Sequence, residues 1–136
     1  MAGWKDIREI AAWRHSREVK KRVDEILQRP DVRKKYKFCD QLSDAARSAP
    51  SNIAEGFGRG GNKVFANHAR IAKGSLIEVL NHIIDARDQD LISEQELLDR
   101  QREILTAVKT TVGLIEHLET HPDPPRKRKP PKPPEP

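Results

Sequence analysis

The clearest helical pattern in the chain lies at residues 62–84, NKVFANHARIAKGSLIEVLNHII. Apolar residues recur there in steps of three and four, which places them on one face of a helix. Asn62 belongs to the residue types that cap helix N-termini. We therefore predict a helix that begins at Asn62 and ends in the charged run 85–90. Its buried face holds Phe65, Ala69, Ala72, Leu76, Val79, Leu80 and Ile83.

A first helix is predicted upstream, and it ends at Pro30 and Asp31, because the residue before a proline avoids helical backbone angles. Its start is open, since four apolar residues fit either this helix or an arm laid across the bundle. The apolar stripe is Ala12, Ser16, Val19, Val23, Ile26 and Leu27, and the four open residues are Trp4, Ile7, Ile10 and Trp13.

A second helix is predicted at residues 34–56, with Pro50 inside it. An interior proline lacks an N–H and collides with the carbonyl of the residue four positions earlier, Ala46, so we expect a kink. Glycines at 56, 58, 60 and 61 should then stop the helix, since glycine enters left-handed conformations without a steric penalty. The stripe of this helix is Phe38, Leu42, Ala45, Ala46, Ala49 and Ile53.

A fourth helix is predicted to open at Ser93. Ser93 and Glu96 have the spacing of a capping box, in which the hydroxyl and the carboxylate each accept from an otherwise unbonded N–H. The residues expected to be buried in this helix are Leu97, Ile104, Leu105, Val108, Val112, Ile115 and Leu118.

Four amphipathic helices joined by short turns predict an all-α fold, an antiparallel up-down-up-down four-helix bundle over residues 1–121. Residues 122–136 hold eight of the ten prolines, a density that precludes helix and favours a disordered, extended tail.

Cys39 is the one cysteine, so no internal disulfide forms and a cytoplasmic location is expected. Neither a signal peptide nor a run of eighteen apolar residues is present, so we expect no membrane partner.

The most distinctive segment is residues 49–59, APSNIAEGFGR. Ser51 or Asn52 is expected to bond a backbone group that Pro50 leaves unpaired, and Glu55 is four positions before Arg59, the spacing of a helical ion pair. We interpret these residues as architectural. A ligand pocket is the alternative, although no residue here supplies its chemistry.

The third helix continues this pattern with Gly74, Ser75 and Glu78. A glycine in a helix interior costs about 1 kcal/mol relative to alanine. We therefore expect Gly74 to allow close packing of the third helix on the alanine-rich second helix.

These residues resemble a known family, the bacterial four-helix-bundle proteins encoded in intervening sequences of large-subunit ribosomal RNA genes. The resemblance covers residues 7–120 and implies a ring, a pentamer, with no known enzymatic activity. It also implies a distant likeness to the accessory variability determinant, which partners a reverse transcriptase and RNA. Two departures are the missing Phe-Pro before the second helix and the additional tail. The matching residues are Trp13, Arg14, Pro50, Ser51, Asn52, Ile53, Ala54, Glu55, Gly56, Gly58, Arg59, Phe65, Ile71, Ala72, Gly74, Ser75 and Glu78.

Patterns that point to catalysis or metal binding are incomplete. Glycines 56, 58 and 61 have dinucleotide-loop spacing, but a helix, not a strand, is predicted before them. His117 and His121 share a helix face, yet no acid or cysteine cluster completes a metal site. We expect no enzyme, no catalytic residues, no metal and no cofactor.

Charge is unevenly distributed along the chain. Residues 1–75 hold 17 Lys and Arg against nine Asp and Glu, whereas residues 76–121 hold four against ten. This polarity favours steering of a polyanion or contact between complementary halves of two subunits. Simple solvation of helix faces is the other interpretation.

The leading hypothesis is a nucleic-acid-associated homo-oligomer that contacts RNA or DNA through a basic face. The alternative is a protein adaptor, such as an accessory subunit of a reverse transcriptase. The basic segment of the tail is interpreted as a polyanion tether, or else as a solubilising sequence. The predicted contacts are Arg14, Arg17, Lys21, Arg47, Arg59, Lys63, Arg70, Arg126, Lys127, Arg128 and Lys129.

Overall fold

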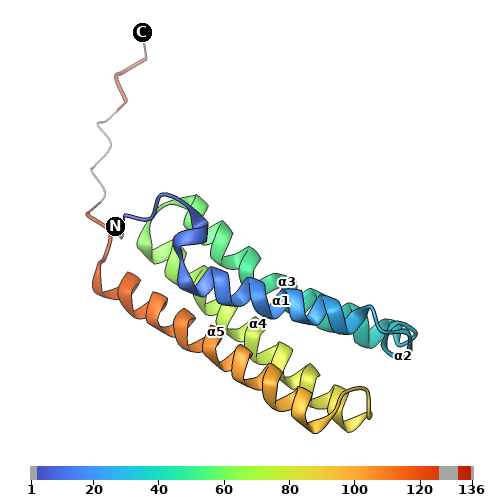
Figure 1. Cartoon of the computed structure of the whole chain (residues 1–136). Helices are drawn as coiled ribbons and strands as arrows, with labels where there is room; N and C mark the ends of the chain where they lie inside the picture. Colours follow the sequence, from blue (N-terminus) through green and yellow to red (C-terminus); the bar gives the residue numbers. More distant parts are fainter. Residues whose placement is uncertain (1–2, 126–131, 136) are drawn as a thin grey trace.

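The computed structural model describes residues 3–125 and 132–135 (Figure 1). Within these ranges all regular structure is helical, and no strand occurs, which confirms the predicted all-α class. The segments 122–125 and 132–135 are in neither helix nor strand. The elements are the 3-10 helix η1 (Ile7–Glu9), α1 (Ala11–Leu27), the short α2 (Pro30–Arg33), α3 (Tyr36–Arg59), α4 (Asn62–Asp88) and α5 (Glu94–Thr120).

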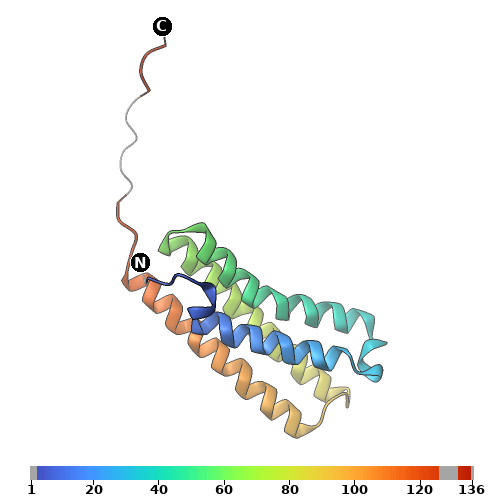
Figure 2. The same ribbon diagram turned by 45° about the horizontal axis from the view of Figure 1, so that its top comes forward.

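The four long helices lie side by side as a bundle. α1 packs against α3 and α5, and α4 packs against the same two helices. Figures 1 and 2 show α2 and the α4–α5 connection at one end of the bundle. The N-terminal arm, the α3–α4 turn and the end of α5 gather at the opposite end, which we call the arm end.

The core consists of two clusters along the bundle axis. One contains most of the apolar stripe of α1, the first half of α3 and the second half of α4. The other lies toward the arm end and joins Ile10, Ile53 and Phe65 to the last turns of α5. The predicted stripe of α4 is confirmed, with Leu80 only partly buried and the other six residues buried.

The N-terminal residues before α1 form an arm rather than the first turns of the helix. Asp6 caps η1, and Glu9 accepts from the Asp6 N–H, so a capping box forms here. Trp13 lies in α1, whereas Trp4 and Ile7 pack against the core from outside it. Beyond the other end of α1, Pro30 is the first residue of α2, and Val32 of this short helix is buried.

The second helix begins and ends later than predicted, because α3 starts at Tyr36, continues through Gly58 and ends at Arg59. The two glycines that stop it are Gly60 and Gly61, whose φ angles are +71° and +91°. Glycine in a helix interior weakens a helix without ending it, and only a required positive φ enforces the stop.

Asn62 is not the N-cap of α4. Gly61 holds that position, and Asn62 is the first helical residue, buried with its amide donating to the His121 carbonyl. The cap comes from the predicted tail, since the Asp123 carboxylate accepts from the N–H groups of Asn62 (2.6 Å) and Lys63 (3.1 Å). A cap so distant in sequence leaves no local signal.

The start of α5 is confirmed at Ser93, whose hydroxyl accepts from the Glu96 N–H at 3.1 Å. The other half of the predicted capping box is wrong, because the Glu96 carboxylate binds the Arg29 guanidinium instead. Leu105, predicted as core, is 45% exposed. The buried face of α5 is turned away from Leu105 and includes Ala107, Thr111 and Leu114.

Candidate nucleic-acid interface

The distinctive segment 49–59 lies entirely within α3, with Pro50 buried. Asn52 Nδ2 donates to the Ser48 carbonyl at 2.9 Å and to Ser48 Oγ at 3.0 Å. Asn52 thus bonds a backbone carbonyl of the segment before Pro50, that of Ser48. Ser51 is exposed.

Asn52 instead connects two helices through a chain of hydrogen bonds. Its amide nitrogen donates to Ser48, so its oxygen is the acceptor that faces α4, and His68 Nδ1 donates to it at 3.2 Å. Ser48 Oγ and Ser75 Oγ lie 2.7 Å apart. Sequence reasoning missed Ser48 and His68, because their partners lie on another helix or outside the motif. We call these four residues, Ser48, Asn52, His68 and Ser75, the polar seam.

Gly56, not Gly74, is the position where α3 and α4 approach closely. A Cβ atom added at Gly56 would stand 2.8 Å from His68 Cβ and 2.8 Å from Phe65 Cδ1. A Cβ at Gly74 meets nothing within 4 Å, so the close packing expected there is wrong. Gly74 points to the outside of α4, where a side chain has room.

The remaining motif residues form local pairs. Arg59 Nη2 donates to Glu55 Oε1 at 3.0 Å, which confirms the ion pair predicted from their spacing. Glu78 Oε1 lies 3.6 Å from His82 Nε2 on the same helix. Each pair lies within a single helix, and neither pair brings a ligand-binding group into a cavity.

The three basic residues predicted on α1 are exposed and share one side of the helix. Arg14 Nη1 donates to the Arg8 carbonyl at 2.8 Å, and the Arg17 guanidinium lies 5.8 Å from the centre of the Trp13 ring. Lys21 Nζ is 3.4 Å from Glu18 Oε1. Within the described ranges, neither Arg14 nor Arg17 forms an ion pair with a carboxylate.

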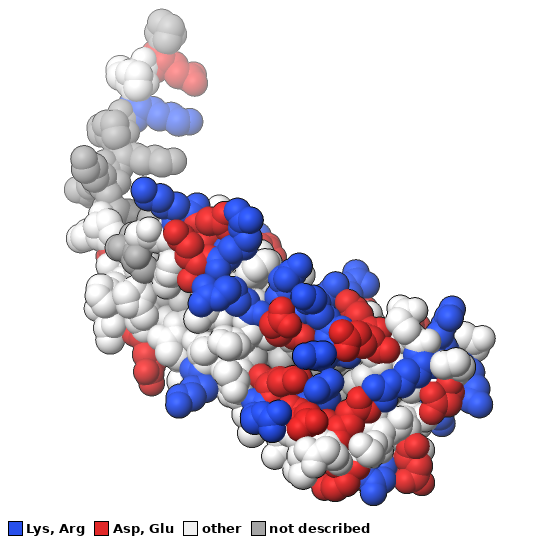
Figure 3. All heavy atoms as spheres, in the orientation of Figure 1, with Lys and Arg blue, Asp and Glu red and all other residues white. Residues whose placement is uncertain are grey.

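The other four predicted cations in the bundle are exposed but distributed over α3 and α4. Arg59 is paired with Glu55, and Arg70 is paired with Glu119 of α5. Figure 3 shows Lys and Arg interspersed with Asp and Glu over the face in view. The structure thus gathers Arg14, Arg17 and Lys21 on one helix and does not join Arg47, Arg59, Lys63 and Arg70 to them; Arg126, Lys127, Arg128 and Lys129 lie outside the described residues.

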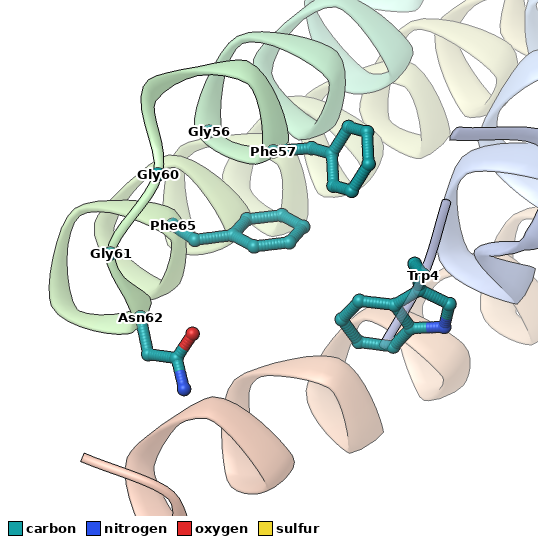
Figure 4. Close-up of a pocket in the computed structure, with 7 residues that line it drawn as sticks. All are labelled: Trp4, Gly56, Phe57, Gly60, Gly61, Asn62 and Phe65. Carbon is teal, nitrogen blue, oxygen red and sulfur yellow. The ribbon is translucent and has the colours of Figure 1, made fainter. Parts of the chain in front are cut away.

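A small apolar cavity of about 160 Å³ lies at the arm end of the bundle. Figure 4 shows the rings of Phe57 and Phe65 pointing from α3 and α4 toward Trp4 of the arm, with Asn62 turned toward α5. Trp4 also packs edge-on against His117, with the ring centres 5.6 Å apart. The arm therefore covers the seam between α4 and α5, and the cavity has no charged lining residue.

The Asp123 carboxylate and the His121 ring at this end form hydrogen bonds with backbone groups. Hydrogen bonds from the N–H groups of Asn62 and Lys63 hold the pKa of the Asp123 carboxyl below its usual range. His121 Nδ1 donates to the His117 carbonyl at 2.8 Å, and the two rings lie 4.3 Å apart. In residues 3–125 and 132–135, no group of three His, Cys, Asp or Glu side chains is arranged to hold a metal ion.

A protein-family model, 23S rRNA-intervening sequence protein, matches residues 8–113. The chain belongs to this family. The match includes α1 with its exposed arginines, the polar seam and Gly56, and it ends before the last turns of α5. A search of curated proteins gave no match. None of the helices in the described part of the chain combines the length and the apolar character that a membrane span requires.

Proposed function

We propose that the chain is a non-enzymatic, nucleic-acid-associated binding protein of the cytoplasm that contacts RNA or DNA through the exposed side of α1. The observation that carries the proposal is the pair Arg14 and Arg17, two neighbouring guanidinium groups with no carboxylate partner in the part of the chain that the structure describes. Unpaired arginines on an ordered helix suit phosphate, whose geometry matches the guanidinium fork.

The proposal includes a closed homo-oligomer, a pentameric ring built from antiparallel up-down-up-down bundles. The contacts of α1 and α4 with both α3 and α5 support that topology. The basic half, residues 1–75, complements the acidic half, residues 76–121, so a contact between unlike surfaces can repeat around a ring. Each copy then presents one α1, and the repeated arginines bind a polyanion with avidity.

The test measures oligomeric mass and nucleic-acid affinity on the same sample of the full chain. Triple reversal of Arg14, Arg17 and Lys21 to Glu should weaken binding to a duplex and to a single strand at every salt concentration. The matched control reverses Arg33, Lys34 and Lys37 to Glu, which changes the charge equally at exposed positions near α2. Comparable loss in both variants would mean that net charge, not the α1 face, determines binding.

Salt dependence separates the bundle from its tail. The slope of log affinity against log salt is about −0.9 per phosphate contact on duplex DNA and about −0.7 on single strands. Deletion of residues 122–136 should make the slope shallower without abolishing binding, because the α1 face is retained. Light scattering that shows only the 15.5 kDa monomer at low and physiological salt would contradict the ring.

A protein adaptor, for example an accessory subunit of a reverse transcriptase, is the second candidate function. It is favoured by apolar side chains that remain exposed on α4 and α5: Ile77 (47%), Ile84 (42%), Leu98 (47%) and Leu105 (45%). Each pair is seven residues apart and so lies along one side of its helix. If the wild-type chain retains neither RNA nor DNA at low salt, the adaptor function replaces nucleic-acid binding.

A further inference from the structure

A hollow on the outer side of α1 combines an aromatic ring with unpaired positive charge. Its volume is about 470 Å³, and it is lined by Arg8, Trp13, Arg14, His15, Arg17 and Glu18. This volume lies in the range of small-molecule sites, about 300–1,000 Å³. It is separate from the apolar cavity under Trp4, which has no cationic lining residue.

The charge of the hollow is concentrated on two side chains. Arg8 is neutralised by Asp6, whose pKa falls to about 2 because of the hydrogen bonds from the Arg8 side chain and backbone. Glu18 is within ion-pair distance of Lys21. Arg14 is fixed at the rim by its bond to the Arg8 carbonyl and keeps its other N–H donors. A net positive charge at Arg14 and Arg17 therefore faces the space.

Trp13 provides a flat apolar surface within this charged setting. Its indole is partly buried and packs against the core cluster of the arm end, which holds the ring in place. The Arg17 guanidinium lies over the ring at 5.8 Å. Because Arg17 is exposed, its side chain can move aside and admit a base onto the Trp13 ring.

We propose that this hollow binds one unpaired nucleotide of a single-stranded nucleic acid, with its base stacked on Trp13 and its phosphate held by Arg14 and Arg17. The inference rests on the proposed function and specifies its ligand. A single strand is required because the base faces in a duplex are covered by their neighbours, whereas a splayed base offers its face to an aromatic side chain.

The experiment uses the intrinsic fluorescence of Trp13 in the full chain. Trp4 is the only other tryptophan, and the Trp4→Phe variant makes Trp13 the single reporter. Titration with a uridine 12-mer should quench the Trp13 emission. An abasic 12-mer with the same number of phosphates should bind more weakly and leave the emission unchanged, and so should a 12-base-pair duplex.

Substitution provides the second measurement. Trp13→Leu should lower affinity for the uridine 12-mer at least about five-fold, which corresponds to the lower end, about 1 kcal/mol, of the stacking energy per base. Affinity for the abasic 12-mer should not change. Trp13→Phe keeps an aromatic face for stacking and should restore most of the affinity for the uridine 12-mer that Trp13→Leu loses. The thermal melt of Trp13→Phe shows whether the fold tolerates substitution at this position.

The outcomes distinguish this inference from the proposed function. If the uridine and abasic 12-mers bind equally and Trp13 is not quenched, the stacking site is overturned while nucleic-acid binding stands. If poly-glutamate quenches Trp13 as strongly as RNA, the hollow is a general anion site and the inference fails. If no nucleic acid binds at low salt, the proposed function itself fails.

Discussion

The α3–α4 seam and the α1–α5 seam hold the same bundle together with different residues. α3 and α4 carry several fully buried alanines, among them Ala49 and Ala69, and Gly56 of α3 lies against Phe65 of α4. At the edge between α1 and α5 the contacts are made by long side chains: Arg22 with Glu103 at 3.9 Å and, just beyond the end of α1, Arg29 with Glu96. Small residues let two backbones approach closely, so an added atom finds no free space. Long side chains can accommodate a change by adopting other rotamers.

The comparison predicts that the α3–α4 seam tolerates change less than the α1–α5 seam. Two side-chain hydrogen bonds cross from α3 to α4, Ser48 with Ser75 and His68 with Asn52, and because they join buried or partly buried residues they fix the register of the two helices. The Arg29–Glu96 pair is partly solvated, with the Arg29 side chain 39% exposed. Three experiments test this difference and a fourth tests the cap of α4, in order of expected effect.

The largest effect is expected for Gly56→Ala. The added Cβ would stand 2.8 Å from two carbon atoms, and overpacking of this kind costs about 1–3 kcal/mol. The controls are Gly58→Ala and Gly74→Ala, where a Cβ meets nothing and the helix gains about 0.5–1 kcal/mol. Urea denaturation should separate Gly56→Ala from its controls by about 2 kcal/mol or more. Equal stability of the three variants would mean that α3 and α4 separate easily.

The polar seam is expected to contribute less than Gly56. Asn52→Ala removes the bonds to Ser48 and His68 and leaves partly buried partners unsatisfied, which costs about 1–2 kcal/mol. Ser51→Ala, at an exposed neighbouring position, should change the free energy of unfolding by less than about 0.5 kcal/mol. Identical denaturation midpoints for the two variants would show that the seam does not stabilise the fold.

The pair on the other seam is predicted to be weaker still. A double-mutant cycle of Arg29→Ala and Glu96→Ala should give a coupling of about 0.5–1 kcal/mol, because solvent screens a pair that is this exposed. Hydrogen bonds from Arg29 lower the pKa of Glu96 below its ordinary 4.5. The coupling should therefore be complete above pH 4.5 and disappear as the pH falls through the lowered pKa. A coupling that persists in acid would contradict this.

The smallest effect is expected at the cap from Asp123. Asp123→Asn removes the charge at the α4 N-terminus and should lower the melting temperature slightly at neutral pH. The pKa of Asp123 lies below its ordinary 3.8, so the charged cap stabilises the fold above pH 3.8 and is lost as the pH falls through the lowered value. The difference between wild type and variant should vanish there. Asp88→Asn removes the same charge at the other end of α4 and is the control for the change in net charge at neutral pH.

Hydrophobic spacing and local caps were enough to predict the helices and several of their ends. The stripe from Phe65 to Ile83 follows helical periodicity, and the burial observed in α4 agrees with it. The Ser93 cap and the Glu55–Arg59 pair are likewise contacts within four residues. The exposed arginines of α1 follow from the same periodicity, because they lie opposite its apolar stripe.

Only the tertiary structure decided which residues, distant in sequence, contact one another. The sequence by itself determined an all-helical chain with a basic first half, since periodicity and charge are properties of local order. It could not show that Gly56 rather than Gly74 meets another helix, that Asp123 caps α4, or that Arg17 lies over Trp13 beside Arg14. Those features depend on how each helix is rotated and where the chain returns, and contacts between distant residues determine both.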